Sequence, residues 1–254
     1  MSGRLTPPRL RICDLDAIHE ALVSASSTTV RLILCREGIL SPLAKNLLEH
    51  ARKLEIEISV ESAREMRRMS DGEGDSELIA LTGPSRETGL EELMTSIGLV
   101  FILVGLRYPG NVGFILRSAE VAGAAGVVLD SPWQGAEFKE ALRVGMRADR
   151  FFPVIHSKAA VAIAAAREAG RRIVALETVG EKVLWNADLE APIAVLVGCE
   201  TTGIEAELLE TADEILRIPT QGFIPSYNVQ AVVSMVLGEW MRQGLAQASN
   251  RSTR

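Results

Sequence analysis

Two patterns of apolar and polar positions alternate along the first third of the chain. From Val30 onward, short aliphatic runs are followed by stretches in which apolar residues recur every three or four positions. In chain order the segments are VRLILC, LAKNLLEHARKL, IEISV, SAREMRRM and ELIALT. The first, third and fifth have the pattern of strands, and the second and fourth have that of amphipathic helices. This alternation predicts a small α/β domain.

A second α/β region opens with the apolar run GLVFILVG, residues 98–105. Uninterrupted apolar runs of this kind are typical of parallel strands that are buried on both faces. Strands are predicted at Leu99–Val104, Gly126–Leu129, Arg172–Leu176, Ile193–Val197 and Glu214–Ile218, with helical patterns between them. The region is therefore predicted to be a parallel sheet with helices on both faces.

The two regions are separated by GPSRETG, residues 83–89, a turn-rich segment that precedes a short helical pattern. Glycine, proline and serine in this density indicate a connection rather than an element. The predicted domains are residues 1–88 and 97–248, with a linker at about residues 83–97.

Composition places the chain among folded, globular proteins. It has 254 residues, of which 47% are hydrophobic and 24% charged, so that each domain can bury its own core. No uncharged apolar run approaches the roughly 18 residues needed to cross a bilayer, and the first residues, MSGRLTPPRLRI, lack the apolar centre of a secretory signal. We expect a cytoplasmic protein without membrane contact.

The cysteines and histidines do not indicate a metal site. Cys13, Cys35 and Cys199 are scattered, and the three histidines complete no metal-binding spacing with them. We expect no metal, and we interpret Cys35 and Cys199 as small hydrophobic residues in strands.

Charge limits how the protein could bind nucleic acid. The net charge of -6 argues against binding through the whole surface, because phosphate contacts depend on Lys and Arg. A local basic face is possible, since Lys139, Arg143, Arg147 and Arg150 are spaced to lie along one side of a helix. The alternative is an ordinary exposed helix face, with Glu137 and Glu140 among the arginines.

Three glycine-containing loops follow strands of the second region. They are GLRYPGNVG (105–113), VGCETTGIE (197–205) and IPTQGFIPSYN (218–228). Because ligands of parallel sheets bind outside the carboxyl ends of the strands, the three loops predict one site.

The familiar nucleotide-binding and hydrolase motifs are missing from these loops. Neither GxGxxG nor GxxxxGK[ST] occurs, which disfavours a nucleotide-dependent oxidoreductase and a P-loop ATPase. No GxSxG elbow is present either. The loops instead carry Asn111, Arg117, Glu200, Ser226 and Asn228, which suit positioning and charge stabilisation. All of these except Arg117 have a simpler explanation: Asn111 could cap a helix near Val112, Glu200 could shape the next helix start, and Ser226 or Asn228 could cap the last helix.

The order of the loop residues is more specific than any one of them. N-x-G-x-x-x-R (Asn111, Gly113, Arg117), G-x-E-x-x-G (Gly198, Glu200, Gly203) and I-P-x-x-G-x-x-x-S-x-N-V (Ile218, Pro219, Gly222, Ser226, Asn228, Val229) follow one another. This series resembles the three motifs of the SPOUT methyltransferases, specifically the SpoU/TrmH family of RNA 2'-O-ribose methyltransferases. The resemblance covers residues 99 to about 243.

The resemblance implies a fold, a cofactor and an activity. It implies a SPOUT domain with a deep trefoil knot, and transfer of a methyl group from S-adenosylmethionine to a ribose 2'-hydroxyl of RNA. The positions that match cofactor contacts are Gly198, Ile218, Gly222 and Tyr227. The positions that match the catalytic set are Arg117, Asn111, Glu200, Ser226 and Asn228. Because a guanidinium is a poor proton acceptor at neutral pH, we assign Arg117 to stabilising the developing alkoxide.

The resemblance also implies partners. Family members form a two-fold dimer through the knot domain, so we expect a homodimer. The first domain is similar to the ribosomal-protein-like substrate-binding domain that many members carry, which slightly favours ribosomal RNA over tRNA. The residues predicted to contact RNA are Arg64, Arg67, Arg68, Arg143 and Arg147.

The chain departs from the family pattern at two places. In the third motif, Tyr227 and Gln230 replace the usual leucine and serine, and relatives often have a small segment with serine and glycine where this chain has RVGMRAD, which includes Arg147. A non-catalytic RNA-binding protein with the same fold is therefore the main alternative. Affinity for S-adenosylmethionine separates it from an enzyme.

Overall fold

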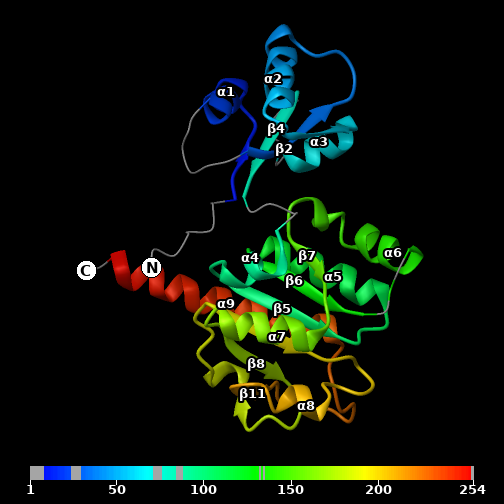
Figure 1. The fold of residues 1–254 in the computed structure, drawn as a ribbon, viewed down its shortest axis with the longest axis vertical. Helices are drawn as coiled ribbons and strands as arrows, with labels where there is room; N and C mark the ends of the chain where they lie inside the picture. The colour runs from blue at the N-terminus through cyan, green and yellow to red at the C-terminus, as the bar shows by residue number, and fades with distance from the viewer. Residues whose placement is uncertain are drawn as a thin grey trace. The chain divides into compact units, whose positions relative to one another are not determined.

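The computed structural model describes residues 9–23, 30–70, 76–83, 88–131, 133 and 135–252, with side chains described up to residue 245. The chain divides into two compact units, residues Leu5–Ser85 and residues Arg86–Arg254, the second of which also includes Met1–Arg4. Figure 1 shows both units.

The smaller unit is a four-stranded mixed sheet with three helices. Its elements are β1 (Arg11–Ile12), α1 (Leu15–Val23), β2 (Val30–Arg36), α2 (Pro42–Lys53), β3 (Glu57–Glu61), α3 (Ala63–Met69) and β4 (Leu78–Thr82). The strand order is β1-β4-β2-β3, in which only β2 and β3 are parallel. The segments predicted from Val30 onward are confirmed, but β1 and α1 were not predicted, because two strand residues and nine helix residues carry little periodic signal.

Residues of α1, α2, β2 and β4 form the core of the smaller unit, with Ile18, Ile33 and Ala44 fully buried. Ser41 caps α2 by accepting a hydrogen bond from the Ala44 amide. Its hydroxyl in turn donates to Glu77 Oε2 at 2.6 Å. This bond is the main reason that the pKa of Glu77 lies below its usual value. The polar contact joins the start of α2 to the start of β4.

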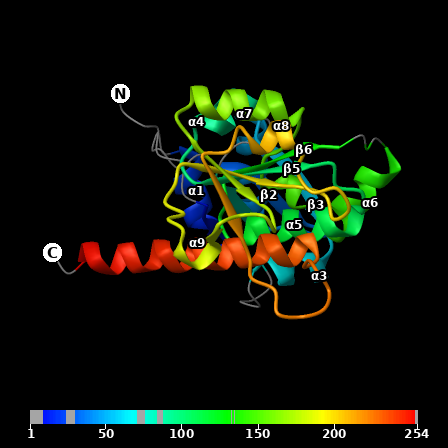
Figure 2. The same ribbon diagram turned by 90° about the horizontal axis from the view of Figure 1, so that it is seen from below.

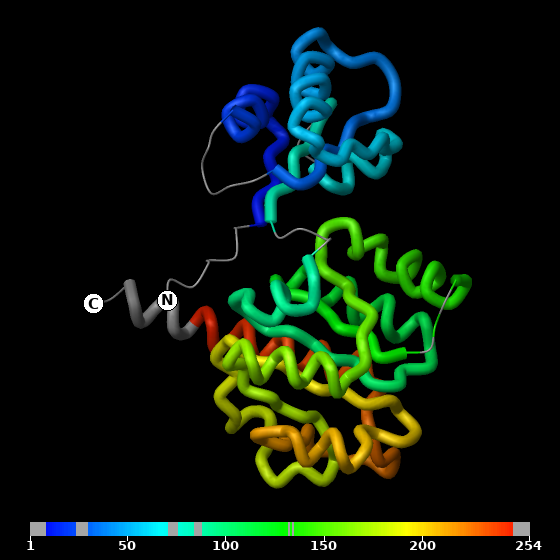
Figure 3. Tube along the Cα trace, viewed as in Figure 1, coloured from blue at the N-terminus to red at the C-terminus, as the bar shows by residue number. Residues whose placement is uncertain are grey.

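The larger unit is a parallel sheet between two layers of helices. Its strands are β5 (Leu99–Val104), β6 (Gly126–Asp130), β7 (Val154–His156), β8 (Arg172–Leu176), β9 (Lys182–Val183), β10 (Ile193–Val197) and β11 (Glu214–Arg217). They are all parallel, in the order β7-β6-β5-β10-β8-β11-β9. In the trace of Figure 3, the green segments and the yellow segments lie on opposite sides of β5. The predicted parallel α/β/α class is confirmed; the short strands β7 and β9 were not predicted.

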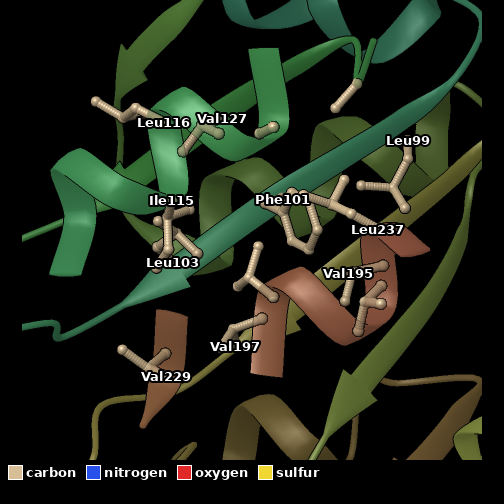
Figure 4. Packing of buried hydrophobic residues seen from close by; sticks show 14 of the residues in the cluster. Leu99, Phe101, Leu103, Ile115, Leu116, Val127, Val195, Val197, Val229 and Leu237 are labelled. Carbon is tan, nitrogen blue, oxygen red and sulfur yellow. The ribbon is translucent and has the colours of Figure 1, made fainter. Parts of the chain in front are cut away.

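Alternating side chains of each strand supply two cores. On one face, Leu99, Phe101 and Leu103 pack with residues of α5 (Pro109–Val121), α6 (Ala136–Val144) and α9 (Val229–Ser252), as Figure 4 shows for α5 and α9. On the other face, Val100 and Ile102 pack with residues of α4 (Leu90–Thr95) and α7 (Ala159–Glu168), and part of α8 (Ala206–Leu209) joins this cluster. In Figure 2, α9 runs beside α5. The strand order does not test the trefoil knot, which stays a prediction.

The predicted linker, residues 83–97, contains the helix α4. Residues 84–87 lie outside the described residues, and α4 belongs to the larger unit, because Leu93 and Met94 are buried in its core. The division into the two units falls between Ser85 and Arg86, and the predicted domain bounds stay a prediction.

One predicted helix face is wrong. Helix α6 ends at Val144, and Gly145 follows as its C-cap. Met146 and Arg147 then take left-handed backbone angles, with φ of 55° and 58°, before a 3-10 turn at Ala148–Arg150. Left-handed residues cannot continue a right-handed helix, so Arg147 and Arg150 do not share a helix face with Lys139 and Arg143.

Among the described residues, no helix is both long and apolar enough to span a membrane, and no group of three or more His, Cys, Asp or Glu side chains could hold a metal ion.

Candidate functional site

Side-chain hydrogen bonds join the three glycine-containing loops at the carboxyl edge of the larger sheet. Asn111, from the first turn of α5, donates from Nδ2 to Glu200 Oε1 in the loop after β10. Asn228, which precedes α9, donates from Nδ2 to Asn111 Oδ1 at 3.2 Å. The three loops therefore meet at one edge of the sheet through residues that are 89 and 117 positions apart in sequence.

A cavity of about 300 Å³ opens beside these contacts. This volume is at the lower end of the usual range for small-molecule sites, roughly 300–1,000 Å³. Its lining comes from the chain after β8, β10 and β11 and from the start of α9. The lining residues are Leu176, Glu177, Thr178, Val197, Gly198, Cys199, Glu200, Thr202, Gly203, Ile218, Thr220, Ser226, Tyr227, Val229 and Val232.

Most of the predicted cofactor residues line the cavity. Gly198, Ile218 and Tyr227 do so, whereas Gly222 does not and is exposed. The hydroxyl of Tyr227 donates to the Pro219 carbonyl oxygen at 3.2 Å, which ties the end of the third loop to its beginning. The tyrosine that departs from the family pattern is thus part of the cavity wall.

The loop after β10 turns back on itself so tightly that it needs two glycines. A Cβ atom on Gly198 would lie 2.6 Å from the Ile204 amide nitrogen, too close for any side chain. Gly203 has φ of +66°, and a Cβ there would collide with the carboxylate of Glu177. The close approach and the left-handed backbone of this turn therefore favour glycine at both positions of G-x-E-x-x-G.

Glu177 is a cavity residue that the sequence analysis did not identify. It follows β8 directly, and its Oε1 accepts a hydrogen bond from the Ile204 amide at 2.6 Å. The rule that ligands bind at the carboxyl ends of parallel strands could have identified it. The loop after β8 was overlooked because it carries no glycine-rich motif of its own.

The surroundings of Cys199 differ from the predicted ones. It lies beyond the end of β10, lines the cavity and is 6% exposed, so that it is not a strand residue. Burial raises the pKa of its thiol, but hydrogen bonds with Thr201 and Thr202 act in the opposite direction and lower it to about 7. A substantial thiolate fraction is therefore expected at neutral pH.

The capping alternatives have mixed outcomes. Helix α5 begins at Pro109, with Tyr108 as its N-cap, so Asn111 is inside the helix and caps nothing. Glu200 is bonded to Asn111, and the next helix has Glu205 as its N-cap. Asn228 does cap α9, since its Oδ1 accepts from the Gln230 amide at 2.9 Å, and it also contacts Asn111.

Arg117 is exposed on α5 and is not among the residues that line the cavity. The exposed apolar side chains Phe114 and Val121 lie on the same helix, 49% and 76% exposed. One copy of the chain therefore brings together the predicted catalytic residues Asn111, Glu200, Ser226 and Asn228 without Arg117.

The predicted RNA contacts lie at two surfaces. In the larger unit, Arg143 and Arg147 are exposed at and beyond the end of α6. Gly145 packs against Gly113, where a Cβ would lie 2.9 Å from the Gly145 amide nitrogen, so this segment is fixed to the part of α5 that carries Asn111. In the smaller unit, Arg64, Arg67 and Arg68 are exposed on α3, where Arg68 is paired with Glu65.

Comparison with known proteins defines the class. The model of the SpoU rRNA methylase family matches residues 98–238, more than half of the chain. The chain therefore belongs to this family. The predicted resemblance is confirmed, and with it an RNA methyltransferase that uses S-adenosylmethionine as its cofactor.

Individual relatives can be aligned with most of this chain. The 23S rRNA (guanosine-2'-O-)-methyltransferase RlmB of Pseudomonas putida is 26% identical over 231 residues, which cover 88% of this chain and 93% of the relative. The crystal structure of an RNA 2'-O ribose methyltransferase has a TM-score of 0.55 at 26% identity and covers 93% of this chain and 89% of that one. The AdoMet-bound rRNA methyltransferase of Sinorhizobium meliloti shares the fold, with a TM-score of 0.59 at 21% identity over 92% of this chain and 87% of that one. Methyl transfer to a ribose 2'-hydroxyl is thus favoured over the non-catalytic and oxidoreductase alternatives.

Proposed function

We propose that the cavity at the carboxyl edge holds S-adenosylmethionine and that the chain, as a cytoplasmic homodimer, methylates a ribose 2'-hydroxyl of ribosomal RNA. The choice of ribosomal RNA is supported by the RlmB relative, whose substrate is 23S rRNA. The proposal depends most on the hydrogen bonds that join Asn111 to Glu200 and Asn228, because they bring the three loops together beside the cavity.

The chemistry of the cavity wall suits this cofactor. Glu177 and Glu200 contribute carboxylates, and no Lys, Arg or His is among the described lining residues. A wall with this charge favours a cationic ligand, and a sulfonium is cationic. Apolar side chains such as Ile218 and Val229 supply a surface for the adenosine.

When bound, S-adenosylmethionine supplies an electrophilic methyl group. The chain's own residues then have to place the ribose oxygen and lower the cost of its developing charge. We assign the orientation of the loops to Asn111, Glu200 and Asn228, with Ser226 at the cavity wall. Arg117 is assigned to binding the developing alkoxide and a neighbouring phosphate, while phosphate or water takes the hydroxyl proton.

A dimer explains where Arg117 stands. Because Arg117 is outside the cavity of its own chain, we propose that it serves the cavity of a second copy. The apolar side chains of Phe114 and Val121 beside it are then covered by the partner. Mixing Arg117→Ala protein with Gly198→Val protein should restore activity, since a mixed dimer has one intact site. No recovery in mixtures that sedimentation shows to contain mixed dimers would contradict this arrangement.

The smaller unit is assigned to recognising the RNA, and residues 97–248 to methyl transfer. Charge reversal at Arg67 and Arg68 tests the first assignment, because it should weaken RNA binding without changing the affinity for S-adenosylmethionine. A matched double reversal at Arg52 and Lys53, both exposed on α2 of the same unit, controls for total charge.

The direct test joins binding to product. Calorimetric titration of the purified protein with S-adenosylmethionine should show micromolar affinity. Incubation with ribosomal RNA and with tRNA, followed by mapping of 2'-O-methyl positions, should then give one new site in ribosomal RNA that disappears with Arg117→Ala. A folded protein that binds no cofactor, or one that methylates only tRNA, would contradict the corresponding part of the proposal.

A further inference from the structure

Glu177 occupies a fixed place in the cavity wall. Its main-chain amide donates to the Leu216 carbonyl oxygen at 2.9 Å, which holds the end of β8 against β11. Its carboxylate is half-buried and lies over Gly203, where a Cβ would collide with it. The position of the carboxylate is therefore set by both the sheet and the turn after β10.

The carboxylate holds that turn in place. Oε1 accepts the Ile204 amide at 2.6 Å, and Oε2 accepts the Thr178 amide at 3.3 Å. The turn contains Gly198, Cys199 and Glu200, so Glu177 positions much of the cavity wall.

Glu177 lines the cavity, and both of its side-chain hydrogen bonds are to main-chain amides rather than to a cationic group. The other lining carboxylate, Glu200, accepts from the side chain of Asn111 and is part of the contact between loops. Glu177 thus differs from Glu200 in that neither of its side-chain hydrogen bonds is to a predicted catalytic residue.

We propose that Glu177 is a specificity-determining residue that distinguishes the charged cofactor from the neutral reaction product. S-adenosylmethionine has a positive sulfonium, whereas S-adenosylhomocysteine has an uncharged thioether and lacks the methyl group. The two molecules otherwise present the same groups to the wall. A carboxylate in a partly enclosed cavity attracts the first more than the second, and the difference favours release of the product after each turnover.

This inference rests on the proposal that the cavity is the cofactor site. Calorimetric affinities for the two molecules are compared in the wild type and in two variants. Glu177→Gln keeps an oxygen to accept the Ile204 amide but removes the charge. Glu177→Ala removes both. Glu181→Gln, at an exposed carboxylate four residues away that does not line the cavity, is the matched control.

Glu177→Gln should weaken S-adenosylmethionine about tenfold and S-adenosylhomocysteine less than about twofold. Glu177→Ala should weaken both, because the turn is no longer held, and hydrogen exchange at the Ile204 amide should become faster in this variant alone. Glu181→Gln should change neither affinity.

Equal weakening of both molecules by Glu177→Gln, or no weakening of either, would overturn the charge selection and leave the cofactor site standing. A folded wild type that binds neither molecule would overturn the site and the selection together. The same conclusion follows if Gly198→Ala, which distorts the wall itself, leaves both affinities unchanged.

Discussion

The two edges of the seven-stranded sheet use polar groups in opposite ways. At the amino edge, the guanidinium of Arg171 is 3% exposed, and all its recorded acceptors are neutral oxygens. They are the carbonyl oxygens of Leu93, Met94, Ser96, Gly98 and Ile193 and the hydroxyl of Ser96. At the carboxyl edge, Asn111 and Glu177 hold loops around a cavity.

The difference shows how one sheet separates stability from binding. Burial lowers the pKa of Arg171 to about 10, yet its donors are bonded to the chain itself, so that nothing is left for a ligand. It joins the end of α4 to the starts of β5 and β10. The carboxyl edge leaves carboxylates and hydroxyls facing a cavity, as expected for the binding side of a parallel sheet.

The largest expected effect is at the amino edge. Arg171→Met should lower the free energy of unfolding by about 3–5 kcal/mol, because several buried carbonyl oxygens lose their donor. Urea denaturation measures this change, and the affinity of the folded protein for S-adenosylmethionine should stay within about twofold. Arg172→Met is the control, since its guanidinium donates to the exposed Asp188 carbonyl. If the affinity for S-adenosylmethionine fell by as much free energy as the stability, the two edges would not have separate roles.

Substitution of one glycine at each edge gives the next largest expected effect. Gly198→Ala places a Cβ against the Ile204 amide, so affinity for S-adenosylmethionine should fall by about thirtyfold, or 2 kcal/mol. Gly170→Ala, next to Arg171, meets no atom within 4 Å but has φ of +73°. It should cost about 1 kcal/mol of stability and no affinity. Calorimetry and urea denaturation of both variants decide the point, and equal effects on affinity would refute it.

Substitutions of Asn228 can separate its role as the cap of α9 from its contact with Asn111. Asn228→Asp keeps the oxygen that accepts the Gln230 amide but loses the donor to Asn111. Its stability should match the wild type while methyl incorporation into RNA falls about tenfold. Asn228→Ala should lose about 1 kcal/mol of stability as well. If Asn228→Asp were fully active, the contact with Asn111 would have no part in the reaction.

The smallest effect concerns Cys199. Alkylation by iodoacetamide should have a midpoint near pH 7 in a Cys13→Ser, Cys35→Ala background. Thr202→Val should move the midpoint upward, because it removes a hydrogen bond that lowers the pKa of the thiol. A midpoint that does not move would show that Thr202 has no influence on it.

The sign of the linked stability follows from the same pKa. Because the folded-state pKa of the thiol is depressed, its contribution to stability is complete above the unfolded value near 9 and is lost as the pH falls through about 7. Comparing urea denaturation of wild type and Cys199→Ser at pH 6.5 and pH 9 measures this contribution, which should be larger at pH 9.

The sequence determined the architecture of the larger unit and the identity of its loops. Continuous apolar strands such as Leu99–Val104 and Ile193–Val197 require a parallel sheet covered on both faces. The order of the three loop motifs was sufficient to predict the family, and the glycines of the second motif lie at a tight turn where a side chain would collide with neighbouring atoms. Local periodicity could not reveal β7 or β9, which have three and two residues.

Only the tertiary structure decided which polar residues meet. Asn111 and Asn228 are 117 residues apart, and no periodicity specifies that their amides bond. Glu177 lines the cavity because β8 lies between β10 and β11 in the sheet. This strand order differs from the order of the strands along the chain. Arg147 does not lie on the predicted helix face, because Gly145 packs against Gly113 and the next residues take left-handed backbone angles. Sequence patterns report what each segment does alone, whereas contacts between distant segments depend on the packing of the whole unit.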